Sequence, residues 1–182
     1  MRRDETIMGT AAGVPFTALP PAAGRDGAAP LVVTWHMLDA PRTDAAFAAA
    51  LPMAEVPAWR VHLGMPMCGR RMRDGSMDAV VELARSDAML DYVEPFIRQA
   101  FDEFPAALAE VCERLPVDDG PIGVVGGSLG GAVALCVLAE RPVPVAAAAL
   151  VNPAIRARSV VGLVEGLIGR PYSWTERSRA AA

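Results

Sequence analysis

The spacing of apolar residues along this chain changes repeatedly between a pattern typical of strands and one typical of helices. Short apolar runs rich in β-branched residues, bounded by glycine, proline or polar residues, predict strands. Such runs lie at residues 31–35, 122–125 and 143–151, and a further strand is expected at 59–63. Two segments at 5–8 and 14–18 flank a glycine-containing turn and predict an opening hairpin. We expect the strand at 143–151 to be buried, because it holds only apolar residues and a proline.

Apolar residues that recur at threes and fours predict helices between these strands. The expected helices cover residues 43–51, 77–115, the run after residue 128, and 160–168. Pro95 and Pro105 interrupt the long segment, so we expect a helix start or a break near each. Strands that alternate with helices predict a single α/β domain over residues 1–182, with a mostly parallel sheet and helices on both faces.

Composition and charge narrow the range of partners and cofactors. The chain has 182 residues, 53% of them hydrophobic, and a formal net charge of −4, which argues against nucleic acid or an anionic membrane as the main partner. All 17 basic residues are arginine, so a Schiff-base lysine and a phosphate loop containing Gly-Lys-Ser/Thr are excluded. Cys68, Cys112 and Cys136 form no metal-binding pattern. We expect no metal, no cofactor and, with no signal peptide or membrane-spanning run evident, a cytoplasmic location.

One motif carries a specific chemical prediction. The apolar run at 122–125 enters a glycine cluster in which Gly126, Ser128 and Gly130 fit the pattern G-x-S-x-G, and a helix-forming run follows. In this sharp strand-to-helix turn a serine hydroxyl is raised above the sheet, and the residues two before and two after it must lack bulk. The helix N-terminus places backbone N–H groups, that of Leu129 first, where an oxyanion would form. Ser128 is therefore the candidate nucleophile.

The strand, turn and helix around Ser128 resemble the nucleophile elbow of the α/β-hydrolase superfamily, and the order of the predicted elements resembles the first six strands of that fold. The resemblance implies a serine hydrolase of esters, thioesters or amides that forms an acyl-enzyme on Ser128, with a small acyl compound as substrate. It also implies a second oxyanion N–H after the strand at 31–35, from His36 or Met37, although Met37 replaces the glycine usual at that point.

The same resemblance implies that serine, acid and histidine follow one another along the chain. Beyond Ser128 the chain has no aspartate and no histidine, so we expect a C-terminally short, partial hydrolase domain whose triad is incomplete in this chain. We also expect the strand at 143–151 to form an exposed edge that pairs with a second copy, unless residues 154–182 fold over it.

Several of these residues have a second interpretation. Ser128 would be a plain helix cap if the glycine-rich turn had no chemical role, and the chain would be a non-catalytic binding or interaction protein if the hydrolase fold served another purpose. His36 is equally consistent with a histidine bonded to backbone. His62, within the strand at 59–63, is expected to be a core residue, and Cys68 a loop thiol.

The charged residues outside the motif also have a functional and a structural interpretation. Arg70, Arg71 and Arg73 are candidates to meet a substrate carboxylate, but a solvated charged loop explains them better. Glu165 and Glu176 are candidates for a displaced catalytic acid, but each also fits a solvated helix face.

Overall fold

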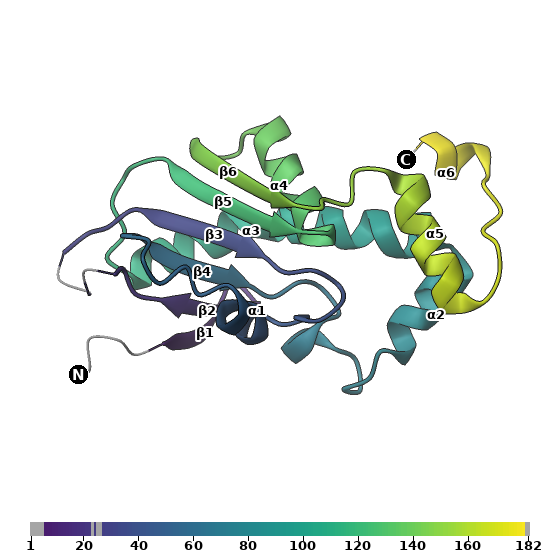
Figure 1. The fold of residues 1–182 in the computed structure, drawn as a ribbon, viewed down its shortest axis with the longest axis horizontal. Helices are drawn as coiled ribbons and strands as arrows, with labels where there is room; N and C mark the ends of the chain where they lie inside the picture. The colour runs from purple at the N-terminus through teal and green to yellow at the C-terminus, as the bar shows by residue number, and fades with distance from the viewer. Residues whose placement is uncertain (1–5, 23, 25–26, 181–182) are drawn as a thin grey trace.

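The chain folds around one sheet whose strands run mostly parallel (Figure 1). The computed structural model describes residues 6–22, 24 and 27–180. Its strands are β1 Ile7–Ala11, β2 Val14–Leu19, β3 Leu31–Trp35, β4 Trp59–Leu63, β5 Ile122–Gly127 and β6 Val145–Val151. They are ordered β1-β2-β4-β3-β5-β6 across the sheet. β1 and β4 each pair antiparallel with β2, whereas β4, β3, β5 and β6 run parallel, which confirms the predicted α/β class.

The register of the parallel strands brings distant chain segments together at one end of the sheet. Trp35, the last residue of β3, lies beside Gly126 of β5, and Gly127 lies beside Val151 at the end of β6. The residues that follow these strands therefore share one edge. This is the carboxyl end of the sheet, where open α/β folds bind their ligands.

Helices cover both faces of the sheet, as the alternation of elements predicts. The helices that flank it are α1 Asp44–Ala50, α3 Glu94–Arg114 and α4 Leu129–Glu140. Helix α1 packs on β2 and β4, and Thr43 caps it by accepting a hydrogen bond from the N–H of Ala46 at 3.0 Å. Helices α3 and α4 lie side by side on the opposite face (Figure 1).

Ring contacts show how alternating side chains anchor these two helical layers. The ring of His62 in β4 meets Phe47 of α1 edge-on, with 5.8 Å between centroids. The ring of Trp35 in β3 meets Phe104 of α3 in the same way at 5.0 Å. Thr34 pairs with His62 in the sheet, so these two side chains lie on the same face, towards α1. Trp35 directly follows Thr34, and its side chain points to the opposite face, towards α3.

The predicted helical segment at 77–115 is divided into three helices. They are α2 Asp78–Ser86, the π-helix η2 Ala88–Val93 and α3, with a short 3₁₀ turn, η1 Gly69–Arg71, ahead of them. Pro95 lies in the first turn of α3, which confirms the helix start expected near it. The break expected near Pro105 is wrong, because α3 continues through it. Pro105 is exposed, so its ring does not disturb the packed face of the helix.

The opening hairpin is tighter than the sequence pattern suggests. β1 extends to Ala11, and only Ala12 and Gly13, at φ of 45° and 81°, connect it to β2. Two central residues at positive φ match the twist of adjoining strands, so the strand continues through residues that the pattern assigns to a loop. The predicted start at Glu5 lies outside the described residues.

β6 forms where a strand is predicted, but the expectation that it is buried is wrong. Residues 146–149 are exposed, and Val151 is 57% exposed. The chain after β6 continues into α5 (Ala157–Ile168) and α6 (Glu176–Ala180), which lie beyond the end of the sheet (Figure 1). Helix α5 packs on α2 and η2. In the strand order β6 lies last, beside β5 alone, so it is an edge strand of the sheet.

We expect the chain to self-associate through β6, because an exposed edge offers unpaired N–H and C=O groups to a second copy. Its mass in analytical ultracentrifugation should rise above that of a monomer as the concentration increases. Ala148→Lys should suppress this rise, since a charged side chain blocks edge pairing, whereas Ala106→Lys, at an exposed site on α3, should not. A wild-type chain that stays monomeric at every concentration would contradict the expectation.

Candidate active site

Ser128 stands at a strained turn between β5 and α4. Its φ of 48° and ψ of −115° are unusual for a residue with a side chain, and conformations of this kind cost on the order of 1–3 kcal/mol. Its side chain makes no capping hydrogen bond to the helix. Both observations match the backbone geometry expected of a nucleophile elbow, and the side chain of Ser128 does not cap the helix in this structure.

Backbone hydrogen bonds from three directions hold this strained residue in place. The N–H of Ser128 donates to the carbonyl of Val151 at 3.0 Å. The carbonyl of Ser128 accepts from the N–H groups of Gly131 at 3.0 Å, Ala132 at 3.2 Å and Ala154 at 2.9 Å. The end of β6 and the first turn of α4 therefore impose the turn, while the hydroxyl of Ser128 takes no part.

The glycines of the motif are required because backbone lies where their side chains would be. A Cβ on Gly126 would come within 2.3 Å of the carbonyl oxygen of Gly130, and a Cβ on Gly130 within 2.3 Å of that of Trp35. Gly131, which the motif does not include, is also confined, since a Cβ there would lie 2.8 Å from Cβ of Pro153. The crowding predicted for this turn is confirmed.

A cleft of about 740 Å³ opens beside Ser128 at the carboxyl end of the sheet. Ser128 and Leu129 form part of its wall, and the rest comes from η2, the segment after β3, the segment between β6 and α5, and α5 itself. Its apolar wall includes Leu38, Val93, Val160, Leu163 and Val164, and its polar wall includes Asp39, Tyr92, Asn152, Arg156 and Ser159. A largely apolar cavity of this size is typical of small-molecule sites.

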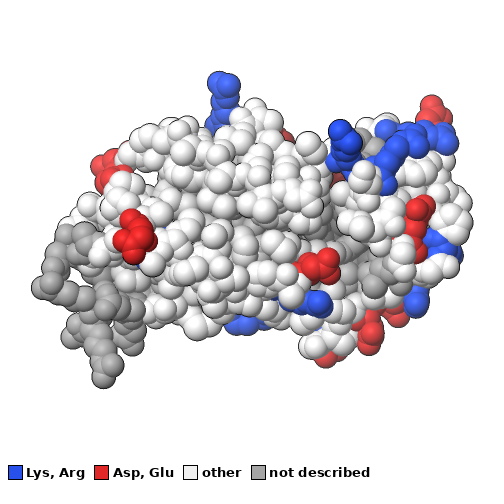
Figure 2. All heavy atoms as spheres, in the orientation of Figure 1, with Lys and Arg blue, Asp and Glu red and all other residues white. Residues whose placement is uncertain are grey.

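Charged side chains are unevenly distributed around this region. Figure 2 shows that the visible surface over the sheet is almost free of charge, whereas acidic and basic side chains gather over the end formed by α2, α5 and α6. Of the residues that line the cleft, Asp39 and Arg156 carry charge, and both are exposed. The interior of the cleft is therefore neutral, with charge of both signs towards solvent.

His36 lies at the end of β3 with its ring fully buried and both ring nitrogens bonded. The backbone N–H of Met65 donates to Nε2 at 3.1 Å, so Nδ1 carries the proton and donates to the carbonyl of Met37 at 2.6 Å. Burial lowers the pKa of His36 below its ordinary value. The ring therefore stays neutral and fixes the path of the backbone after β3.

Of the residues after β3, Leu38 is the first to line the cleft. Neither His36 nor Met37 belongs to its wall. The side chain of Met37 instead covers Gly127, where an added Cβ would lie 2.9 Å from the methyl carbon of Met37. The glycine usual at the position of Met37 is thus replaced by a side chain that packs over the last residue of β5.

His62 is a core residue, as the sequence predicts. Its Nδ1 shares a hydrogen bond of 2.8 Å with the hydroxyl of Thr34, and its Nε2 has no hydrogen-bond partner among the described residues. Burial, reinforced by the nearby charge of Arg60, lowers the pKa of His62 to about 4. His62 does not line the cleft.

Arg70 and Arg71 form ion pairs that the sequence did not predict, although the side chain of Arg70 remains 43% exposed. Arg70 forms an ion pair of 2.8 Å with the buried carboxylate of Asp44, and Arg71 forms one of 2.7 Å with Glu103 of α3. Arg73 is exposed.

Cys68 lies in the loop ahead of η1, as the sequence predicts, and it is 2% exposed. Burial raises the pKa of the Cys68 thiol to about 11, so it stays protonated and unreactive at neutral pH.

The glutamates considered as displaced acids do not line the cleft. A carboxylate oxygen of Glu165 accepts a hydrogen bond from the N–H of Tyr172 at 2.7 Å, and Glu176 is exposed. Within residues 6–22, 24 and 27–180, no cluster of three or more histidine, cysteine or acidic side chains could hold a metal ion.

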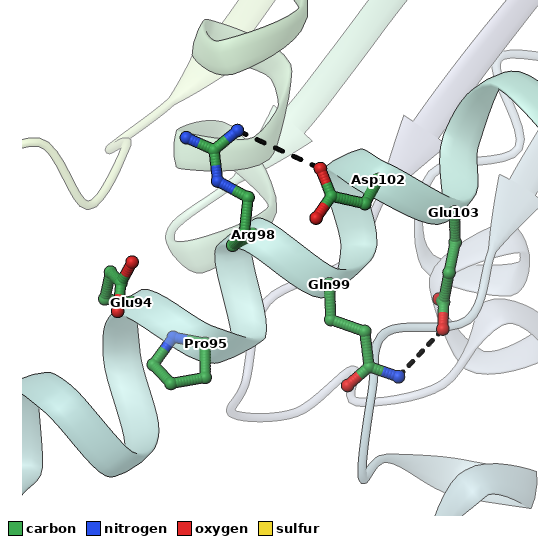
Figure 3. A pocket seen from close by; sticks show the side chains of 6 residues that line it. All are labelled: Glu94, Pro95, Arg98, Gln99, Asp102 and Glu103. Atoms are coloured by element: carbon green, nitrogen blue, oxygen red, sulfur yellow. Dashed lines mark hydrogen bonds and ion pairs between the residues drawn. The ribbon is translucent and has the colours of Figure 1, made fainter.

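A second hollow of about 560 Å³ lies on the outer side of α3 (Figure 3). Four of its polar side chains pair with one another: Arg98 lies 3.9 Å from Asp102, and the amide of Gln99 donates to Glu103 at 2.8 Å. The hollow shares no lining residue with the cleft at Ser128. These four side chains are thus engaged in pairs on the helix surface.

Several residues of the cleft carry no signal in the sequence. Tyr92, Asn152 and Arg156 line it, yet no motif or spacing marks them. The one available signal is local: Asn152 follows the end of β6 at a φ of 44°, and asparagine is a residue that tolerates this region.

Comparisons with known proteins show which fold this geometry belongs to. The sequence profile described as alpha/beta hydrolase fold matches residues 74–181, more than half of the chain. The chain is similar to the crystal structure of TT1662 from Thermus thermophilus, with 23% identity and a TM-score of 0.57 over 91% of this chain and 67% of that one. A comparison with curated protein sequences found no match.

Other similar structures are much longer than this chain. A membrane phospholipase A, described as a bacterial virulence factor, has 18% identity and a TM-score of 0.50 over 83% of this chain and 40% of its own length. A prolyl endopeptidase has 20% identity and a TM-score of 0.50 over 82% of this chain and 21% of its own. At these identities the likeness concerns the fold. No helix within the described residues is long and apolar enough to cross a membrane.

The buried, neutral His62 predicts that stability falls as the pH is lowered. Its pKa of about 4 in the folded chain lies below the ordinary value of about 6.5, so between these values the unfolded chain binds more protons. Its contribution is intact above pH ~6.5 and is lost towards pH ~4, by up to about 3 kcal/mol. Urea unfolding at several pH values should show this loss, and His62→Gln should reduce it. An unchanged pH dependence in His62→Gln would contradict the assignment.

The crowding at the turn predicts a sharp contrast between two substitutions. Gly130→Val should destabilise the fold by about 3 kcal/mol or more, because its side chain would collide with backbone, whereas Gly166→Val, with nothing within 4 Å of its Cβ, should change stability by less than about 1 kcal/mol. Ser128→Ala should leave the unfolding free energy within about 0.5 kcal/mol of wild type. Urea unfolding measures all three, and a loss of about 1 kcal/mol in Ser128→Ala would instead indicate a cap.

Proposed function

The chain belongs to the α/β-hydrolase fold family, and on this basis we propose that it is a serine hydrolase of a carboxylic ester, thioester or amide. Ser128 attacks the acyl carbonyl and forms an acyl-enzyme. One observation carries the proposal: Ser128 has a φ of 48° at the start of α4, while its hydroxyl makes no capping bond. Backbone strain of this kind is concentrated at functional sites.

Backbone N–H groups at the cleft hold the oxyanion in this proposal. Leu129 is the first residue of α4 and lines the cleft beside Ser128, and the first N–H groups of a helix have no partner within it. The sequence predicts the second N–H at His36 or Met37, but neither lines the cleft, and Leu38 is the first residue after β3 that does. In this proposal the second N–H is therefore that of Leu38, on the backbone that the ring of His36 fixes after β3. Each donor of this kind is worth roughly 10²–10³ in kcat.

Activation of Ser128 needs a general base, and neither histidine of the chain fits that role. Both ring nitrogens of His36 are bonded to backbone, and His62 lies in the core against Thr34 and Phe47. A serine hydrolase deprived of its base loses roughly 10⁶-fold in kcat. We therefore expect the isolated chain to bind its substrate but to turn it over very slowly.

The proposed partner is a small acyl compound rather than nucleic acid or a membrane. The cleft of about 740 Å³ is mostly apolar, and a net charge of −4 does not favour polyanions. Three free cysteines are consistent with a reducing compartment, so we propose that the chain works in the cytoplasm.

A binding protein on the hydrolase fold is the second candidate, and one observation favours it. The described residues place no histidine at the cleft, although the cleft itself is well formed. A binding protein would take the same small ligands without forming any covalent bond to Ser128.

Chemical rescue with imidazole separates the two candidates, because a diffusible base can replace a missing one. The chain is incubated with p-nitrophenyl butyrate with and without imidazole, and intact mass spectrometry follows the butyryl adduct. We expect imidazole to speed the release of p-nitrophenol and the appearance of an adduct that maps to Ser128.

Two variants control for hydrolysis by imidazole itself and for other serines. Ser128→Ala should abolish the protein-dependent rate and the adduct, whereas Ser159→Ala, at another serine of the same cleft, should retain both. Equal rates for wild type and Ser128→Ala would contradict the hydrolase proposal. Rapid turnover by wild type without imidazole would instead assign the base to His36 or His62.

A further inference from the structure

The chain segment that follows β6 gives the cleft a wall with three unengaged polar side chains. Asn152, Arg156 and Ser159 all line the cleft, and all three are exposed. Within the described residues no hydrogen bond or ion pair engages their side chains. We call these three residues the polar strip. Their hydrogen-bond donors are therefore available to a ligand in the cleft.

Backbone contacts fix the start of the polar strip beside Ser128. The carbonyl of Val151 accepts from the N–H of Ser128 at 3.0 Å, and the N–H of Ala154 donates to the carbonyl of Ser128 at 2.9 Å. Asn152 lies between these two bonds, at a φ of 44°. Arg156 follows Ala154 by two residues, a backbone distance of at most about 7 Å, and the side chain of an arginine spans a similar length. The guanidinium can therefore reach a ligand held at Ser128.

The two charged residues of the cleft lie on opposite sides of Ser128. In the strand order β3-β5-β6 the serine follows the middle strand, while Asp39 belongs to the segment after β3 and Arg156 to the segment after β6. Of the described residues that line the cleft, Arg156 alone is basic and Asp39 alone is acidic. Neither forms an ion pair within the described part of the chain. A ligand at Ser128 therefore has a negative charge on its β3 side and a positive charge on its β6 side.

These charges define the ligand group that fits the polar strip. A guanidinium donates two parallel hydrogen bonds to a planar carboxylate. Ser159 follows Arg156 by three residues, one helical turn along α5, and adds a hydroxyl donor close to it. One guanidinium balances the single charge of a carboxylate, and Asp39 repels that charge from the β3 side. The remaining wall, which includes Leu129 and Val160, suits an apolar chain.

We propose that the polar strip selects acyl compounds that carry a carboxylate, and that Arg156 is the residue that determines this specificity. The carboxylate binds on the β6 side of Ser128, and the repulsion from Asp39 fixes that orientation. The inference deepens the proposed function, since it rests on the cleft beside Ser128 being the substrate site. It narrows the substrate class to esters, thioesters or amides that bear a carboxylate on an apolar chain, such as monoesters of dicarboxylic acids.

The test compares a carboxylate probe with a neutral probe of nearly the same shape. The probes are 6-oxoheptanoate and its primary amide, 6-oxoheptanamide, and ligand NMR gives Kd for each at neutral pH. Neither probe carries an activated acyl group, so the measurement does not depend on turnover at Ser128. We expect the wild-type chain to bind the carboxylate about three- to tenfold more tightly than the amide. This preference should shrink as the salt concentration rises.

Two variants should change the preference in opposite directions, and a third is the matched control. Arg156→Gln should remove the preference by weakening binding of the carboxylate probe. Asp39→Asn should increase it by about two- to threefold, because a repulsive charge is lost. The control is Arg158→Gln, which removes the same charge from the same helix. The guanidinium of Arg158 lies 5.3 Å from the centre of the Trp174 ring, and Arg158 does not line the cleft, so this variant should leave the preference unchanged.

The proposal is overturned if the wild-type chain binds neither probe or binds both equally. It is also overturned if Arg156→Gln and Arg158→Gln lower the preference by the same factor, since that result would reflect net charge alone, or if Asp39→Asn lowers it. Failure of imidazole rescue with the Arg156 result intact would reject the hydrolase proposal while keeping the ligand site. Successful rescue without any carboxylate preference would reject the role of the polar strip alone.

Discussion

Direct backbone contact between the end of β3, the end of β5 and the start of α4 is the constraint on which the rest of the site depends. The position that a side chain on Gly130 would occupy is taken by the carbonyl of Trp35, and the one beside Gly126 by the carbonyl of Gly130. The helix therefore leaves the sheet at the closest approach that backbone allows, and the residue between strand and helix must adopt a positive φ. Ser128 is strained because its neighbours are packed, and its hydroxyl is left free for other contacts.

The position of the C-terminal segment determines both the cleft and the open edge of the sheet. Because α5 packs on α2 and η2, it adds an apolar wall to the cleft at Ser128 and leaves β6 exposed. One carboxylate joins these walls: Asp87 caps η2 and also accepts a hydrogen bond from Tyr172, which follows α5. The wall that carries Tyr92 and the wall that carries α5 are thus held by the same residue.

The features predictable from the sequence are those that depend on local sterics. The elbow at Ser128 follows from the spacing of glycines after a strand. The layered α/β fold follows from segments with the apolar spacing of strands that alternate with segments with the apolar spacing of helices. Features that depend on partners distant in sequence were not predictable. Arg70 appears solvated until Asp44 is brought beside it, and an alanine-rich run such as β6 does not reveal whether any element covers it. Arg156 has no local signal, because its place in the wall of the cleft depends on how the segment after β6 packs.

The placement of the nucleophile and its activation are physically separate in this fold. Backbone contacts alone set the angles of Ser128 and put the N–H of Leu129 at the helix N-terminus beside it, so no titratable group is needed to build the elbow. Both histidines have structural roles. His36 fixes the backbone after β3 through both ring nitrogens, and His62 stays neutral in the core. Charging either ring would break those contacts or bury an unpaired cation, which opposes folding. Any base that activates Ser128 must therefore approach it from the cleft, and not from within the sheet.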